Sequence, residues 1–96
     1  MASIGQYVIV RARDQGCVAG VYSGHVGREV TLTEARQIYS WAGNRLTLFD
    51  VSQLVGECRL SVAVPEVTIL DACGIIAGIP DDVESYLRNT RADNQE

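Results

Sequence analysis

Arginine and aromatic side chains are the residues of this sequence best suited to bind a ligand. Arg36, Tyr39 and Trp41 lie within six positions of one another. Aromatic rings stack on nucleobases, and a guanidinium group donates paired hydrogen bonds to phosphate. This combination is typical of a nucleotide site. The same rings would also fit a hydrophobic core or a subunit interface, so that interpretation stays open.

Further side chains extend this candidate site. Arg11 and Arg13 share one face of a predicted strand, from which both guanidinium groups could contact phosphate. Tyr22 is a weaker aromatic candidate. All eight basic residues are Arg, a bias that either serves bidentate anion binding or reflects only the base composition of the source genome. The candidate ligand-binding residues are therefore Arg11, Tyr22, Arg36, Tyr39 and Trp41.

Patterns for catalysis and metal binding are missing from the sequence. It has one His, His25, no Lys, and no nucleophile or phosphate-loop motif. Cys17, Cys58 and Cys73 are far apart and form no C-x-x-C pair, so we expect small buried residues of a reducing cytosol. We predict no enzyme, no cofactor and no metal site. A small phosphodiesterase, or a Cys nucleophile using His25, is the less favoured alternative.

Composition limits the partners. The chain has 96 residues, 47% of them hydrophobic, and a net charge of −4. We expect one domain over residues 1–90 and a polar, frayed tail over 91–96. No basic patch is present for a nucleic acid polymer. The uncharged stretch Ala72–Pro80 is too short for a membrane helix, and no secretory signal is visible.

Short strands are expected to form the framework that positions these residues. Hydrophobic alternation predicts strands over 6–13, 17–25 and 29–33, joined by turns into an antiparallel meander. Gly20, inside the second of these, indicates a bulge or a close backbone approach. Residues 58–64 are expected to form a strand ended near Pro65.

Residues 34–41 would suit either a helix or a strand, and an internal similarity favours the strand. Val30–Ile38 aligns with Val67–Ile75, and each block carries an acid–Ala pair at the same point. We therefore predict a strand, a kink and a further strand in each block, with the later strands at about 36–41 and 73–77. Chance similarity between two segments of strand-like composition is the other explanation.

Two helices complete the predicted α+β fold. Thr47 and Asp50 form the N-terminal signal of the first helix, whose apolar face would include Val51, Leu54 and Val55 before Gly56. The second helix begins at Pro80-Asp81 with an Asp81…Glu84 capping box and carries Val83, Tyr86 and Leu87 on one side. The whole is a small curled antiparallel sheet of about seven short strands with two short helices.

Several stretches of the sequence resemble a family of small phage proteins that includes the anti-Thoeris sponges. The matching stretches are Tyr7–Arg11, Gly16–Gly20, Glu29–Gly43, Glu66–Ala72 and Ile75-Ile76. The similarity covers about residues 7–79. The sequence departs from the family pattern at Ser40, where an aromatic residue is common, and at 77–79, where a Pro-Thr turn is common.

The resemblance implies a binding function. Anti-Thoeris sponges capture cyclic ADP-ribose-type signals without cleaving them. It implies a phage-encoded sponge in the cytoplasm of an infected bacterial host, which blocks a nucleotide-signalled defence such as Thoeris or CBASS. It also implies a homo-oligomer, from a dimer up to a hexamer, with ligand pockets between subunits. A structural or adaptor oligomer of the phage is the alternative.

Overall fold

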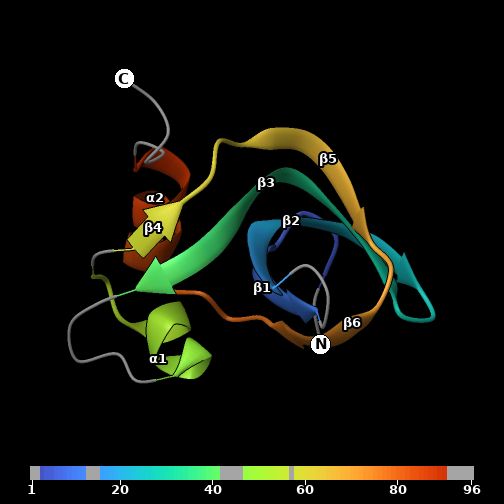
Figure 1. The fold of residues 1–96 in the computed structure, drawn as a ribbon, viewed down its shortest axis with the longest axis horizontal. Helices are drawn as coiled ribbons and strands as arrows, with labels where there is room; N and C mark the ends of the chain where they lie inside the picture. Colours follow the sequence, from blue (N-terminus) through green and yellow to red (C-terminus); the bar gives the residue numbers. More distant parts are fainter. Residues whose placement is uncertain (1–2, 13–15, 42–46, 57, 91–96) are drawn as a thin grey trace.

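Within the residues that the structure describes, a six-stranded antiparallel sheet packs against two short helices (Figure 1). The α+β class is thereby confirmed. This computed structural model describes residues 3–12, 16–41, 47–56 and 58–90. Its elements are β1 (Tyr7–Ala12), β2 (Gly16–Val26), β3 (Glu29–Trp41), α1 (Leu48–Gln53), β4 (Cys58–Leu60), β5 (Val64–Ile69), β6 (Ala72–Ile76) and α2 (Asp81–Asn89).

Some expectations concern other parts of the chain. Arg13, the predicted turns at 14–15 and 43–44, and the tail over 91–96 lie outside the described residues.

The first strand is buried on both of its faces. Its side chains from Tyr7 to Val10 are at most 3% exposed. Tyr7 and Ile9 face the core formed with the two helices, whereas Val8 and Val10 face a second core enclosed by the curled sheet. One sheet therefore separates two hydrophobic cores, and β1 contributes to both.

The sheet curls because the long strand β3 has two successive partners along one edge. β3 pairs β2 on one side, while on the other β5 pairs its first half and β4 its second half. β6 pairs β1 at the far edge. In Figure 1, β3 and β5 arch over β1 and β2, β6 passes beneath them, and both helices lie at the β4 end.

A bulge in β3 decides which core its side chains enter. The pairing of β2 with β3 shifts register between Ala19 and Val21, and Glu34 has a φ of +50°. Val30 and Leu32 point into the inner core before the bulge, and Ala35 points there after it. The extra residue therefore inverts the alternation, as β-bulges do. A left-handed conformation costs a non-glycine residue about 1 kcal/mol.

The bulge also explains the strand count. We predicted separate strands over 29–33 and 36–41, but β3 continues through the bulge because its pairing with β2 resumes beyond it. The strand interpretation of 34–41 is confirmed. The expected Gly20 feature is confirmed as well, because Gly20 lies within the register shift and packs closely against β3.

The two similar sequence blocks pair with each other. Their partners are Val30 with Ile69, Thr31 with Thr68, and Leu32 with Val67. The pairing is therefore symmetric about Thr31 and Thr68, which are equivalent positions of the two blocks. The hydroxyl oxygens of these two residues lie 3.3 Å apart. Each block changes direction at its acid–Ala pair, within β3 in the first and between β5 and β6 in the second. The blocks therefore form a structural repeat with a local two-fold relation.

The helix signals are confirmed in part. Thr47 caps α1 in a capping box with Asp50, as predicted. However, α1 ends at Gln53, and Leu54 and Val55 are 51% and 48% exposed. Their assignment to the apolar face was wrong, because the extended backbone at Leu54 ends the helix before they reach the core.

The second helix follows the predicted pattern except at its start. Val83 and Leu87 are buried in the core on the helix side of the sheet, and Tyr86 packs against it. The Asp81…Glu84 capping box is wrong, since Pro80 is the N-cap and makes no side-chain hydrogen bond. The acidic residues of the first turn instead stabilise the positive end of the helix dipole.

Two further expectations need correction. The strand predicted over 58–64 ends at Leu60, and Pro65 lies inside β5. β5 tolerates this proline because Val64 and Glu66, on either side of it, are the residues registered with β3. Cys58 is buried as expected, but Cys73 is exposed because β6 is an edge strand.

We expect Gly20→Ala to lower the free energy of unfolding by about 1–3 kcal/mol. A Cβ at this position would lie 3.0 Å from the Thr33 carbonyl oxygen and 3.1 Å from the Ala35 Cα. Both belong to paired backbone that cannot move aside. Urea denaturation measures the effect. Gly74→Ala is the control, because a Cβ there meets nothing within 4 Å; equal losses in both variants would contradict the close approach.

Candidate anion-binding site

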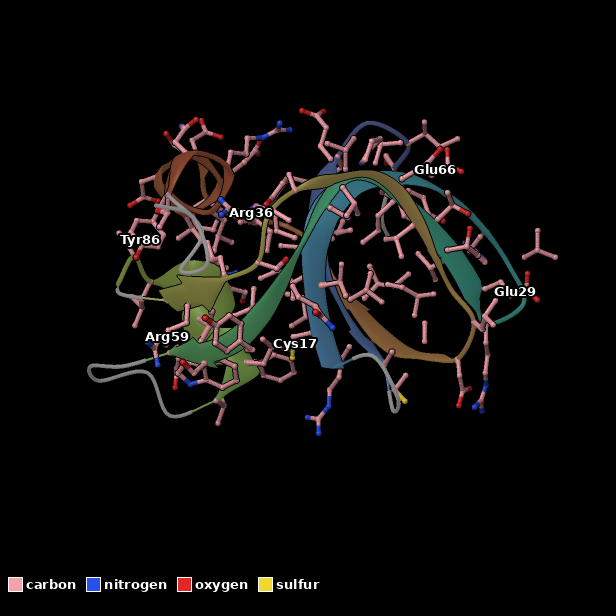
Figure 2. The ribbon with its side chains drawn as sticks, turned by 45° about the horizontal axis from the view of Figure 1, so that its top comes forward. Cys17, Glu29, Arg36, Arg59, Glu66 and Tyr86 are labelled. Carbon is pink, nitrogen blue, oxygen red and sulfur yellow. The ribbon has the colours of Figure 1, made fainter. Side chains whose placement is uncertain are left out.

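The bulge places Arg36 on the helix side of the sheet, where it becomes a buried cation. The side chain is only 6% exposed. Figure 2 shows it between β3 and α2. Its Nε–H donates to the Ser61 carbonyl oxygen and one Nη1–H donates to the Leu87 carbonyl oxygen, both at 2.9 Å. Arg36 therefore ties β3 to the β4–β5 connection and to the last turn of α2.

Arg36 has no carboxylate partner among the described residues. Its hydrogen-bond acceptors are carbonyl oxygens, and its remaining N–H groups carry no hydrogen bond within the described part of the chain. The unbonded nitrogen of Arg36 is not fully buried. Among the described residues, the fully buried side-chain atom without a hydrogen-bond partner is Tyr7 Oη. Buried charges in proteins are ordinarily paired, so this guanidinium is a candidate anion-binding group.

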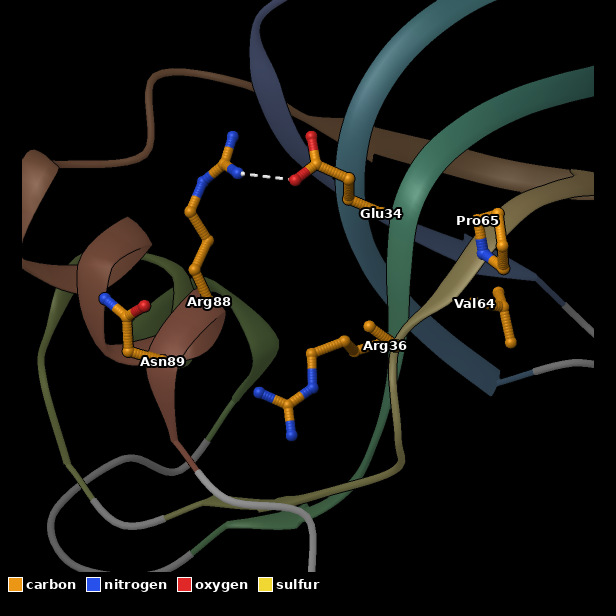
Figure 3. Close-up of a pocket in the computed structure, with 7 residues that line it drawn as sticks. Glu34, Arg36, Val64, Pro65, Arg88 and Asn89 are labelled. Carbon is orange, nitrogen blue, oxygen red and sulfur yellow. Dashed lines mark hydrogen bonds and ion pairs between the residues drawn. The ribbon is translucent and has the colours of Figure 1, made fainter.

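Arg36 also lines a pocket of about 410 Å³. Its walls are formed by Glu34 and Arg36 from β3, Val64 and Pro65 from β5, and Arg88 and Asn89 from α2 (Figure 3). We call this the Arg36–Arg88 pocket. Two arginines and one carboxylate line it, so its lining is cationic.

Arg88 is the second cation of the pocket and is held from three sides. Its Nε–H donates to Glu84 Oε2 at 2.8 Å, and its Nη1 lies 3.3 Å from Glu34 Oε1. Its guanidinium carbon lies 4.9 Å from the centroid of the Tyr7 ring, in a cation–π contact. The geometry of Arg88 is therefore set before any ligand arrives.

Tyr7 adds a buried hydroxyl close to these charges. Its Oη has no hydrogen-bond partner among the described residues. Burial raises the pKa of Tyr7 to about 12, although the charges of Arg88 and Arg36 act to lower it. The hydroxyl therefore stays protonated at neutral pH and keeps a free donor beside the two arginines.

The predicted aromatic platform is not formed. Tyr39 is 55% exposed and, by the strand alternation, faces away from the helices. Trp41 is partly buried and packs against the core on the helix side. An irregularity in the pairing of β3 with β4 between Ile38 and Ser40 turns Trp41 to that side. Arg36, Tyr39 and Trp41 therefore do not converge within one subunit.

Arg11 lies at a different pocket, which we call the Arg11 pocket. It has a volume of about 440 Å³ and is mainly apolar, with Phe49 of α1 and Ile75 of β6 among its walls. Arg11 makes no hydrogen bond or ion pair within the described part of the chain. The last predicted residue, Tyr22, is buried in the inner core and its hydroxyl bonds His25 Nδ1.

Sequence reasoning missed Glu34 and Arg88, which line the pocket, and Tyr7, whose ring contacts Arg88. Glu34 stood in the repeat as the acid of the kink, which was a usable signal. Arg88 follows Glu84 by one helical turn, a spacing that indicates a surface ion pair rather than a ligand site. Only the packing of α2 on β3 brings these residues together.

Among the described residues, no group of three or more His, Cys, Asp or Glu side chains could hold a metal ion. Neither helix found there has the length and apolar composition needed to cross a bilayer.

Fold and pocket together define a small curled-sheet domain with a cationic pocket beside its C-terminal helix. A family model described as a domain of unknown function, DUF6948, matches residues 5–86. The chain therefore belongs to this family. No curated protein matches the chain, and no solved structure does.

We expect Arg36→Met to lower the free energy of unfolding by about 3 kcal/mol, because two carbonyl oxygens would lose a charged donor. Urea denaturation measures the change. Arg28→Met is the matched control, since the side chain of Arg28 is 76% exposed and pairs with the carboxylate of Asp71. Similar small losses in both variants would show that Arg36 does not anchor α2.

We expect Tyr7 to make the protein less stable in alkali. The unfolded side chain titrates near its usual pKa of 10.0, whereas the folded one titrates at about 12. The contribution of Tyr7 to the free energy of unfolding is therefore fully present below pH 10 and is lost as the pH rises towards 12. Between pH 8 and pH 11 the wild type should lose about 1.4 kcal/mol more than Tyr7→Phe. Parallel losses in urea denaturation would contradict the raised pKa.

Proposed function

We propose that this protein is a non-catalytic binding protein that sequesters a small phosphorylated, nucleotide-derived signal. The observation that carries the proposal is Arg36, a cation only 6% exposed, without a carboxylate partner in the described residues, at the wall of a pocket. Holding such a charge is unfavourable unless an anion compensates it. An anionic ligand bound in the pocket would compensate the charge of Arg36.

The pocket suits a ligand larger than a free ion. Its volume of about 410 Å³ lies within the usual range for small-molecule sites. The arginines supply charge-assisted donors for phosphate, and Val64 and Pro65 supply an apolar wall for a sugar or base. These features support a nucleotide-like ligand over inorganic phosphate.

The resemblance to the anti-Thoeris sponges adds the biological setting to this proposal. In that setting the protein is phage-encoded and acts in the infected host cell by withholding a cyclic nucleotide or a cyclic ADP-ribose-type signal. Tight binding without turnover needs preorganised donors rather than a base or nucleophile. Arg88 meets that need, since Glu84 and the Tyr7 ring hold it in place.

A second candidate function is that of a structural or adaptor oligomer. Phe49, in the Arg11 pocket, is 71% exposed, and Leu54 and Val55, which directly follow α1, have about half their surface exposed. Exposed apolar groups of this kind favour contact with another protein surface. In this alternative the Arg36–Arg88 pocket would stay empty in cells.

A thermal-shift panel tests the proposal. Cyclic dinucleotides, cyclic trinucleotides and cyclic ADP-ribose isomers would be added to the purified protein. A ligand at a hundred times its Kd should stabilise the fold by about 2.7 kcal/mol, and heat should release it chemically intact by mass spectrometry. A cleaved product would favour a phosphodiesterase, and no shift with any compound would favour the adaptor.

Arg88→Gln locates the site, because it removes one cation while leaving the carbonyl contacts of Arg36 in place. We expect its affinity for the bound ligand to fall at least about tenfold. Arg28→Gln, which removes an exposed arginine paired with Asp71, is the control and should bind as the wild type does. Equal affinity in all three proteins would place the ligand elsewhere, with the Arg11 pocket as the next site to examine.

A further inference from the structure

Among the described residues that line the Arg36–Arg88 pocket, Glu34 is the one carboxylate, and it forms an ion pair with Arg88. We propose that this carboxylate occupies the position of a ligand phosphate in the free protein, and that the phosphate group of the ligand displaces it. The inference rests on the proposed function. It adds that a phosphate group anchors the ligand and that this group must displace the Glu34 carboxylate, which we call the gate.

The charges of the pocket are distributed unevenly. Arg88 has two carboxylate neighbours, Glu84 and Glu34, whereas Arg36 has none among the described residues. Within the pocket wall, two cations therefore face a single anion. A ligand that brings more than one negative charge restores the balance at both arginines, which Glu34 alone does not.

Glu34 is held loosely enough to leave. Its side chain is 66% exposed, and its oxygen lies 3.3 Å from the Arg88 nitrogen, a long distance for an ion pair. Its backbone has the left-handed φ of +50°, a conformation that glycine adopts more easily. If the position were needed for the bulge alone, glycine would adopt this conformation with less strain. The presence of a glutamate therefore indicates a role for its side chain.

Arg88 should keep its position when Glu34 moves away. The shorter contact, 2.8 Å to Glu84, comes from one turn earlier on the same helix. The Tyr7 ring supports the other side of the guanidinium, at 4.9 Å. Displacement of Glu34 would thus expose a prepared donor rather than release a flexible side chain.

The arrangement favours phosphate over carboxylate as the anchoring group. Figure 3 shows Glu34 bonded to the guanidinium of Arg88, with the guanidinium of Arg36 apart from both and pointing away from them. A planar carboxylate satisfies one guanidinium fork, whereas the several oxygens of a phosphate or diphosphate can accept from two.

The internal repeat supplies a matched control. Asp71 is the equivalent acid in the second block, and it pairs with Arg28 at the same distance of 3.3 Å. The side chain of Arg28 is 76% exposed and that of Asp71 is 34% exposed, and neither residue is among those that line the Arg36–Arg88 pocket. Asp71→Asn therefore removes the same charge in the same motif, away from the pocket.

The experiment measures binding of inorganic pyrophosphate by isothermal titration calorimetry to the wild type, Glu34→Gln and Asp71→Asn. We expect Glu34→Gln to bind about five to ten times more tightly than the wild type, because the competing carboxylate is gone. Asp71→Asn should match the wild type. Adding Arg88→Gln to Glu34→Gln should abolish the gain. Circular dichroism and melting curves confirm that each variant is folded.

Three results would overturn the inference. They are equal or weaker binding by folded Glu34→Gln, an equal gain in Asp71→Asn, and no pyrophosphate binding by any of the proteins. Its failure is distinguishable from failure of the proposed function. If nucleotides bind the wild type but Glu34→Gln shows no gain, only the gate is wrong. If pyrophosphate shows the gain but no nucleotide-derived signal binds, only the proposed function is wrong.

Discussion

One extra residue in β3 controls the arrangement of the whole helix side. Before Glu34, the even-numbered residues Val30 and Leu32 enter the core inside the curled sheet. After it, the even-numbered residues Arg36 and Ile38 face the helices instead. Without the bulge, regular alternation would drive a guanidinium into an apolar interior. The left-handed Glu34 is therefore the constraint on which the pocket, the helix anchor and the second core all depend.

The anchor and the pocket are two consequences of the same buried guanidinium. Arg36 uses part of its donor set on the carbonyl oxygens of Ser61 and Leu87, which holds α2 against the sheet. The same side chain lines the Arg36–Arg88 pocket. A residue that supports the fold is a precise place from which to bind a ligand, because packing has already restricted its rotamers. It is also a poor target for a binding test, since its removal disturbs the fold.

Local sequence patterns predicted much of the fold and little of the site. Alternation located β1 and β2, the Thr47 cap located α1, and the acid–Ala repeat located both kinks. These are signals between near neighbours. The partners of Arg36 lie 25 and 51 positions away, so no local pattern reports them. The face of Trp41 depends on an irregularity in strand pairing, which the sequence does not show either.

The two carbonyl oxygens that share Arg36 belong to different parts of the chain, the β4–β5 connection and the final turn of α2. Tyr86 adds a second tie, because its hydroxyl accepts a hydrogen bond at 3.1 Å from the backbone N–H of Cys58. The C-terminal helix and β4 are therefore unable to open independently. In amide hydrogen exchange they should behave as one cooperative unit, and an occupant of the neighbouring pocket would slow the exchange of both together.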